Sequence, residues 1–73
     1  MYKCYSIQNE LDKRMALKGF TNSTLATHLN ITYQYLSSIR NRKVNASPKL
    51  AKRIADALGV EIEDIFEFDK KEK

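Results

Sequence analysis

The stretch Thr21–Arg40, TNSTLATHLNITYQYLSSIR, decides how this 73-residue chain folds. Read with the 3.6-residue period of a helix, it divides into two amphipathic segments, residues 22–29 and 33–40. The apolar residues of each segment recur on one face: Leu25, Ala26 and Leu29 in the first, and Leu36 and Ile39 in the second. The stretch therefore predicts two short consecutive helices, each with one face for a core.

Helix-start signals and a very short turn support this division. Thr21 and Thr32 immediately precede the two segments, where a side-chain oxygen can accept from the free amides of a first helical turn. Before Thr32 the connection holds only Asn30 and Ile31, and asparagine tolerates the left-handed conformation usual after a helix. Two helices joined so tightly must cross steeply, which leaves the outer face of the second one free. This is the arrangement of a helix-turn-helix, whose second helix enters the DNA major groove.

Three segments of the chain share the spacing of a known family. They are GFTNSTLATHLNIT at residues 19–32, YQYLSSI at residues 33–39 and LAKRIADALGVEIEDIF at residues 50–66. From Leu11 to Phe66 the chain thereby resembles the helix-turn-helix domains of the phage Cro and repressor (XRE-like) family. The resemblance implies an all-α fold, a lambda-repressor-like bundle of five short helices, with residues 1–73 as a single domain.

Apolar periodicity and end signals place the remaining helices. A first helix is expected over residues 7–18, closed by Gly19. Ser47-Pro48 is a start signal for a helix that ends at about Leu58. A short fifth helix is expected over residues 62–67. The core side chains expected from the first helix are Ile7, Leu11 and Met15, supplemented by Ala16 and Leu17.

The two ends of the chain carry weaker signals. Residues 1–6, MYKCYS, alternate loosely, a pattern shared by a short strand, a disordered arm and an extra helical turn. We expect a partly ordered extension that packs near the C-terminus. Residues 69–73, DKKEK, are expected to fray.

Composition limits the class of protein. Apolar residues make up 42% of the chain, too many for disorder, and 73 residues leave no room for a second core. Cys4 is the only cysteine, so neither an internal disulfide nor a thiolate metal cluster can form. No apolar run approaches the roughly 20 residues of a membrane span, and the first ten residues lack a signal-peptide core. A cytoplasmic protein, encoded by a bacterium or a phage, is expected.

Charge is divided unevenly along the chain. Residues 1–55 hold ten Lys and Arg against two acids, whereas residues 56–73 hold three Lys against seven acids. A basic body favours a polyanionic partner. The acidic C-terminal segment would not bind a polyanion and is available for another contact, such as a protein partner.

Two positions depart from the family pattern near the end of the second segment. The family usually pairs an arginine of the first helix with a glutamate at the position of Arg40, and both partners are replaced here. Arg40 is therefore expected to be free of that ion pair. A glycine is frequent in the family where Arg42 stands, so Asn41 is expected to take the left-handed conformation instead.

The outer face of the second helix is the candidate for base recognition. Glutamine can pair bidentately with adenine, serine can bond several bases, and a tyrosine edge can contact a thymine methyl. Family position assigns base reading to Tyr33, Gln34 and Ser38, with Ser37 at the margin.

Phosphate contacts position such a helix without reading sequence directly. Two helix N-termini add amides and a favourable dipole. Tyr35 is expected to divide its role, with its ring against the preceding helix and its hydroxyl toward a phosphate. The other candidates for the DNA backbone are Asn22, Thr32, Arg40, Asn41, Arg42 and Lys43.

The sequence contains no recognisable catalytic or metal-binding motif. Cys4 has no histidine near it in sequence, and the chain has no glycine-rich phosphate loop. The acids of residues 61–69 fit dipole matching and solubility at a helix start better than a metal cluster. We therefore expect no enzymatic activity, no cofactor and no metal.

The expected function is a sequence-specific transcriptional regulator, by resemblance a repressor that binds a palindromic operator on double-stranded DNA as a homodimer. The closing helix often supplies the dimer contact in the family, which implicates Ile62, Ile65, Phe66 and Phe68. Two alternatives stay open. One is an antitoxin-like module that binds a protein through the acidic C-terminal end, and the other is an architectural or recombination factor that bends DNA.

Overall fold

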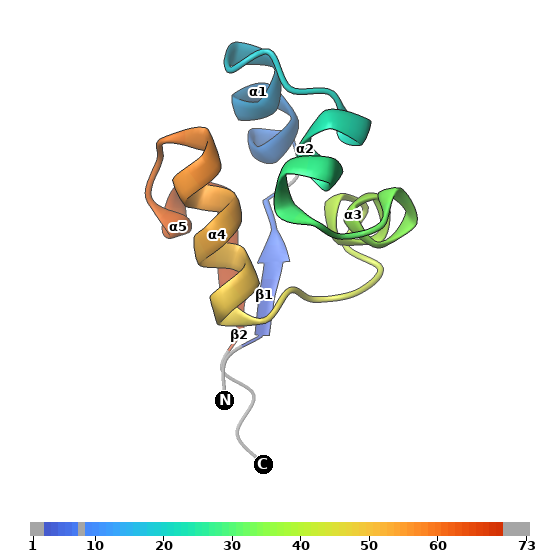
Figure 1. Ribbon diagram of the computed structural model, residues 1–73. Helices are drawn as coiled ribbons and strands as arrows, with labels where there is room; N and C mark the ends of the chain where they lie inside the picture. Colours follow the sequence, from blue (N-terminus) through green and yellow to red (C-terminus); the bar gives the residue numbers. More distant parts are fainter. Residues whose placement is uncertain (1–2, 8, 70–73) are drawn as a thin grey trace.

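The structure, a computed structural model, describes residues 3–7 and 9–69. Its helices and strands are short and follow one another with brief connections (Figure 1). In chain order they are β1 (Lys3–Ser6), α1 (Glu10–Leu17), α2 (Asn22–Leu29), α3 (Tyr33–Arg40), α4 (Pro48–Leu58), α5 (Ile62–Ile65) and β2 (Phe66–Asp69). The fold is thus mostly helical, with five helices and one small sheet among the described residues.

The boundaries of α2 and α3 are those predicted. The Thr21 hydroxyl accepts from the amide of Thr24 at 3.1 Å, and the Thr32 hydroxyl accepts from the amide of Tyr35 at 3.0 Å. Asn30 has a φ of 61°, in the left-handed region. The two caps and the asparagine turn are confirmed, and they fix where the recognition helix begins.

The first helix is shorter than predicted. It begins at Glu10 rather than Ile7, because the amide of Ile7 donates to the carbonyl of Ile65 and Asn9 adopts a φ of 75°. Ala16 is exposed and the side chain of Leu17 is 73% exposed, so the expectation that they supplement the core is wrong. The spacing of apolar residues did not predict that a strand precedes α1.

The chain ends form a two-stranded antiparallel sheet, which corrects the all-α prediction. Strands β1 and β2 pair with Ser6 opposite Phe66 and Lys3 opposite Asp69. Residues 3–6 of the expected extension are therefore a strand beside the C-terminal segment, while residues 1–2 lie outside the described residues. Asp69, expected in a frayed tail, is the last residue of β2, and residues 70–73 lie outside the described residues.

Helix α5 ends two residues earlier than predicted, and its apolar residues serve the monomer's own core. Ile65 is fully buried and Phe66 is 1% exposed. Both were expected at a dimer interface, and that expectation is wrong for them. Ile62 is half-buried against the core, and Phe68 is 42% exposed. The sequence prediction continued the helical spacing of apolar residues past Ile65. The chain becomes a strand at Phe66, where side chains alternate between the two faces of the sheet.

A single core joins the helices and the sheet. Strand β1 lies between α3 and α4 (Figure 1), and its other edge meets the loop after α3, where the amide of Ala46 donates to the carbonyl of Cys4 at 2.8 Å. Of the five helices described, none combines the length and apolar character needed to cross a bilayer. The buried apolar residues are Cys4, Leu11, Met15, Leu25, Ala26, Leu29, Leu36, Ile39, Ala46, Leu50, Ala51, Ile54, Ala55, Leu58, Ile65 and Phe66.

Candidate nucleic-acid interface

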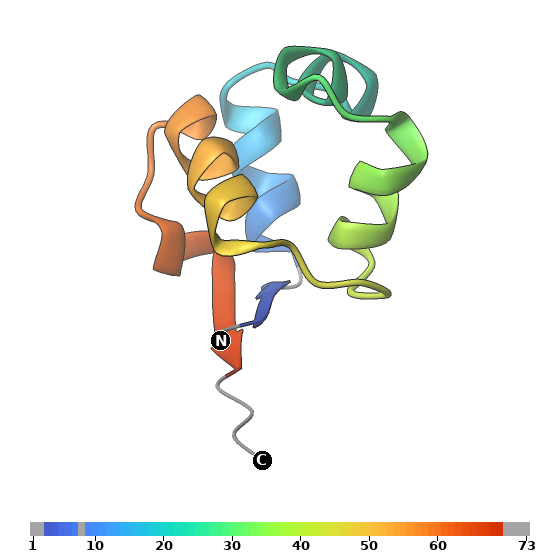
Figure 2. The ribbon, with the colours of Figure 1, turned by 60° about the horizontal axis from the view of Figure 1, so that its bottom comes forward.

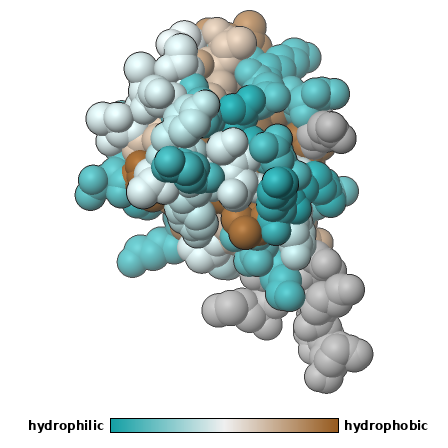
Figure 3. Space-filling model, turned by 90° about the vertical axis from the view of Figure 1, so that its right-hand side faces the viewer, coloured by the Kyte–Doolittle hydropathy of each residue, from teal (hydrophilic) through white to brown (hydrophobic). Residues whose placement is uncertain are grey.

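Helix α3 stands at the edge of the molecule, and its outer face is open to solvent (Figure 2). Leu36 and Ile39 are fully buried, so the helix is held by one apolar side. Seen from the side that carries α2 and α3, the surface is mostly hydrophilic, with few apolar side chains (Figure 3). This is the surface expected of a helix that meets a polar partner.

The four residues expected to read bases lie on the outer side of α3. Tyr33 is 53% exposed and Gln34 is exposed, whereas Ser37 and Ser38 are half-buried. Positions 33, 34, 37 and 38 form one stripe along the helix, because residues three or four apart lie on the same face. The stripe begins in the first turn of α3, the part of a recognition helix that contacts base edges.

Several candidates for phosphate contacts are exposed beside this stripe. Tyr35, Asn41 and Lys43 are all exposed. The Thr32 hydroxyl caps α3 as an acceptor, which leaves its own proton available to a phosphate oxygen. Thr32, Tyr35, Asn41 and Lys43 thus stay candidates for contacts with the DNA backbone.

Arg40 lacks the family's ion pair, but it has other partners that the sequence did not predict. Its Nε donates to Asp12 Oδ1 at 2.7 Å, its Nη2 lies 2.6 Å from the same oxygen, and its Nη1 donates to Asn22 Oδ1 at 2.9 Å. An ion pair between the same two helices thus replaces that of the family, with the charges exchanged: the acid is on α1 and the base is on α3. Asn22, expected at the DNA backbone, is half-buried and turned into this contact.

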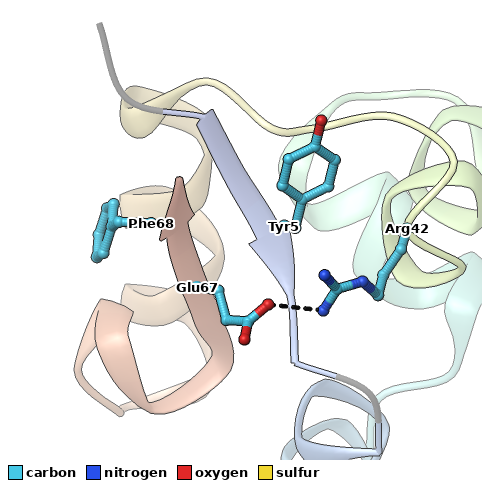
Figure 4. A pocket seen from close by; sticks show the side chains of 4 residues that line it. All are labelled: Tyr5, Arg42, Glu67 and Phe68. Carbon is cyan, nitrogen blue, oxygen red and sulfur yellow. Dashed lines mark hydrogen bonds and ion pairs between the residues drawn. The ribbon is translucent and has the colours of Figure 1, made fainter. Parts of the chain in front are cut away.

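Arg42 is also engaged inside the protein. Its Nη1 donates to the carbonyl of Ser6 at 2.9 Å and to Glu67 Oε1 at 2.8 Å, and its guanidinium lies 5.7 Å from the centre of the Tyr5 ring. Figure 4 shows Tyr5, Glu67 and Arg42 gathered on one side of the sheet, with Phe68 pointing away. The side chain of Arg42 therefore ties the loop after α3 to both strands.

Arg42, not Asn41, adopts the left-handed backbone conformation. Its φ is 62°, whereas Asn41 has a φ of −87°, so the expectation for Asn41 is wrong. An arginine has a Cβ and strains this region, where the family's glycine does not. The contacts of its guanidinium with β1 and β2 offset that strain.

Substitutions at Arg42 should separate the strain from the contacts. Arg42→Gly and Arg42→Ala both lose the contact with Glu67, but only alanine keeps the strained backbone. We expect Arg42→Gly to be more stable than Arg42→Ala by about 1–2 kcal/mol in urea unfolding. Lys43 is the control because its φ is not positive, so Lys43→Gly should be the less stable variant there. Equal stabilities of the two Arg42 variants would contradict the strain.

Cys4 is a core residue and not a reactive one. It is fully buried, and burial raises the pKa of its thiol by disfavouring the thiolate. Since the thiolate is the nucleophilic form, the side chain acts here as a small apolar group.

Two residues with functional contacts were missed by sequence reasoning. Asp12 binds Arg40, and the Ser6 hydroxyl donates to the carbonyls of Ile39 and Arg40, both at 3.0 Å. Ser6 and Arg40 are 34 positions apart, and no local pattern signals such a pair. The signal in the sequence was Arg40 itself, because a basic side chain at the end of α3 favours an acidic partner, although its position is not given.

Known proteins are similar to this chain in sequence or in fold. The family model for the Cro/C1-type HTH DNA-binding domain matches residues 10–71. A protein named as an uncharacterized HTH-type transcriptional regulator, from Methanocaldococcus jannaschii, is 38% identical over 66 residues, which cover 90% of this chain and all of that protein. The crystal structure of a protein from Bacteroides fragilis superposes with a TM-score of 0.74 at 19% identity, covering 88% of this chain and 98% of that one. At that identity the crystal structure supports the fold alone.

Proposed function

Since the chain belongs to the Cro/C1-type HTH DNA-binding domain family, we propose that it is a sequence-specific transcriptional regulator that represses by occupying a promoter. The observation that carries the proposal is the polar stripe on α3, with Tyr33 and Gln34 exposed and Ser37 and Ser38 half-buried, on a helix whose opposite side is fully buried. The name of the archaeal relative, an HTH-type transcriptional regulator, supports the same role. Steric exclusion of polymerase requires neither a ligand nor a cofactor.

Two kinds of contact are proposed at the DNA. Tyr33, Gln34 and Ser38 read base edges, with Ser37 at the margin of the stripe. Thr32, Tyr35, Asn41 and Lys43 contact the phosphate backbone, assisted by the amides and dipoles at the N-termini of α2 and α3. Arg40, Arg42 and Asn22 are left out of this set, because their side chains are bound within the protein.

Alanine substitutions distinguish the two kinds of contact. Gln34→Ala should cost about 1–3 kcal/mol on the best duplex and relax preference at one base pair. Lys43→Ala should weaken binding to all duplexes about equally and reduce the salt slope by about one. The measurement is fluorescence anisotropy on the best and the scrambled duplex at several salt concentrations. Equal losses on both duplexes for Gln34→Ala would refute its role as a base reader.

The proposed active form is a homodimer on a palindrome, because one such domain makes few base contacts. Its half-sites would lie about one helical turn, roughly 34–36 Å, apart. Ile65 and Phe66 are excluded as its contacts, since each is buried within the monomer. Sedimentation equilibrium with and without a palindromic duplex tests this assembly. A protein that stays monomeric at high micromolar concentration and binds the duplex as one copy would contradict it.

A further inference from the structure

Helix α3 has few neighbours to fix its direction. It packs mainly against α2, which precedes it across the tight turn, and against β1. Its apolar anchors, Leu36 and Ile39, are two side chains on an eight-residue helix. A helix held in this way can pivot about the turn unless its far end is fixed as well.

Polar contacts fix that far end from three elements. Arg40, the last residue of α3, is bound by Asp12 of α1 and by Asn22 of α2. The Ser6 hydroxyl of β1 donates to the final carbonyls of the same helix. We propose that Asp12 and Ser6 are positioning residues for base recognition, which hold the C-terminal end of α3 at the angle that the DNA groove requires. The inference rests on the proposed function.

The geometry of Arg40 suits a rigid link. Three of its nitrogen atoms have partners, two on Asp12 Oδ1 and one on Asn22 Oδ1, so the plane of the guanidinium is fixed in direction. The side chain of Arg40 is 28% exposed and that of Asp12 is 51% exposed, so the link lies at the protein surface. Asp12 belongs to α1, so the link joins the recognition helix to the helix that precedes the helix-turn-helix.

Ser6 acts on the helix backbone itself. The last carbonyls of a helix lack partners within it, and the hydroxyl of Ser6 supplies one from a residue 1% exposed to solvent. A hydroxyl carries one proton, so the two carbonyls at 3.0 Å share it or exchange it. The end of α3 is thereby bound to the strand that pairs with the C-terminus.

Neither positioning residue belongs to the base-reading stripe. Asp12 lies on α1 and Ser6 is buried, whereas bases are read by the outer side of α3. Hydrogen bonds to base edges tolerate little error, because sites must be held within about 0.5 Å and 10–20° of the productive geometry. A small rotation of α3 should therefore reduce sequence discrimination more than it reduces attraction to phosphates.

The test compares two carboxylates on the same helix. Asp12→Asn removes the negative charge that pairs with Arg40, and Glu10→Gln makes the same change of charge at a residue that instead lies 3.5 Å from Arg14. The quantity measured is the ratio of the dissociation constants for a scrambled and for the best duplex, at one salt concentration and a temperature at which every variant is folded. Asp12→Asn should lower this ratio by about tenfold or more, in the range of one lost base contact. Glu10→Gln should leave it unchanged.

Two further measurements separate the inference from its premise. Ser6→Ala, which acts through the backbone, should lower the same ratio, and Asp12→Asn should speed amide exchange at the end of α3 without DNA. Equal ratios for Asp12→Asn, Glu10→Gln and the unmodified protein would overturn the positioning role while the proposed function stands. An unmodified protein that does not discriminate between duplexes would refute the proposed function, and the positioning role with it.

Discussion

Replacing Phe66 with alanine should destabilise the folded chain by about 3–5 kcal/mol. The side chain is 1% exposed and lies at the junction of α5 and β2, where it is among the largest that are fully buried. A domain of this size has a total stability of only several kcal/mol, so the variant should be largely unfolded at 37 °C. Circular dichroism during urea unfolding measures the loss.

Protein concentration distinguishes a core residue from a dimer contact. If Phe66 belongs to the monomer's core, its substitution should cost the same free energy at low and high micromolar concentration. Phe68→Ala is the matched control, since this side chain is 42% exposed and should cost far less. A loss for Phe66→Ala below about 1 kcal/mol, or one that grows with protein concentration, would contradict its place in the core.

The combined variant Tyr33→Ala, Gln34→Ala and Ser38→Ala should lose nearly all sequence preference. Specific binding usually exceeds non-specific binding by about 4–10 kcal/mol, and base contacts supply much of that difference. Because alanine favours helices and these side chains lie outside the buried apolar core, α3 should persist. Affinity for the best duplex should fall to the level of scrambled DNA.

Binding of the same variant to scrambled DNA is the internal control. The phosphate contacts proposed for Thr32 and Lys43 are untouched, so non-specific affinity and its salt slope should stay close to those of the unmodified protein. Anisotropy titrations on both duplexes measure this. A variant that still prefers the best duplex would show that base reading lies outside the outer face of α3.

Local signals were sufficient to predict the helix-turn-helix from sequence. Thr21 and Thr32 cap the helices through amides three residues away, and Asn30 turns the chain by its own conformation. Each of these interactions spans only a few positions, so the spacing of residue types records it directly. The start of α4 at Ser47-Pro48 follows for the same reason, with the Ser47 hydroxyl accepting from the amide of Leu50.

Contacts between distant parts of the chain could not be predicted in this way. The pairing of β1 with β2 joins residues 60 to 66 positions apart, and it changed both ends of the predicted bundle. Arg40 was expected to be available because the family's ion pair is missing, and Arg42 was expected at a phosphate because its loop follows the second helix of the helix-turn-helix. Their actual partners, Asp12 and Glu67, are acids that nothing in the sequence singles out. The sequence therefore did not reveal that the protein uses the side chains of Arg40 and Arg42 in internal contacts.

Selection of random duplex DNA by the purified full chain at physiological salt tests the proposed function most directly. We expect enrichment of a short palindrome, with half-sites about one helical turn apart. The variant Gln34→Ala should enrich a sequence that differs at one position in each half-site. Binding to DNA with no enriched sequence would contradict base reading by α3, and a protein that retains no duplex at all would contradict the proposed function.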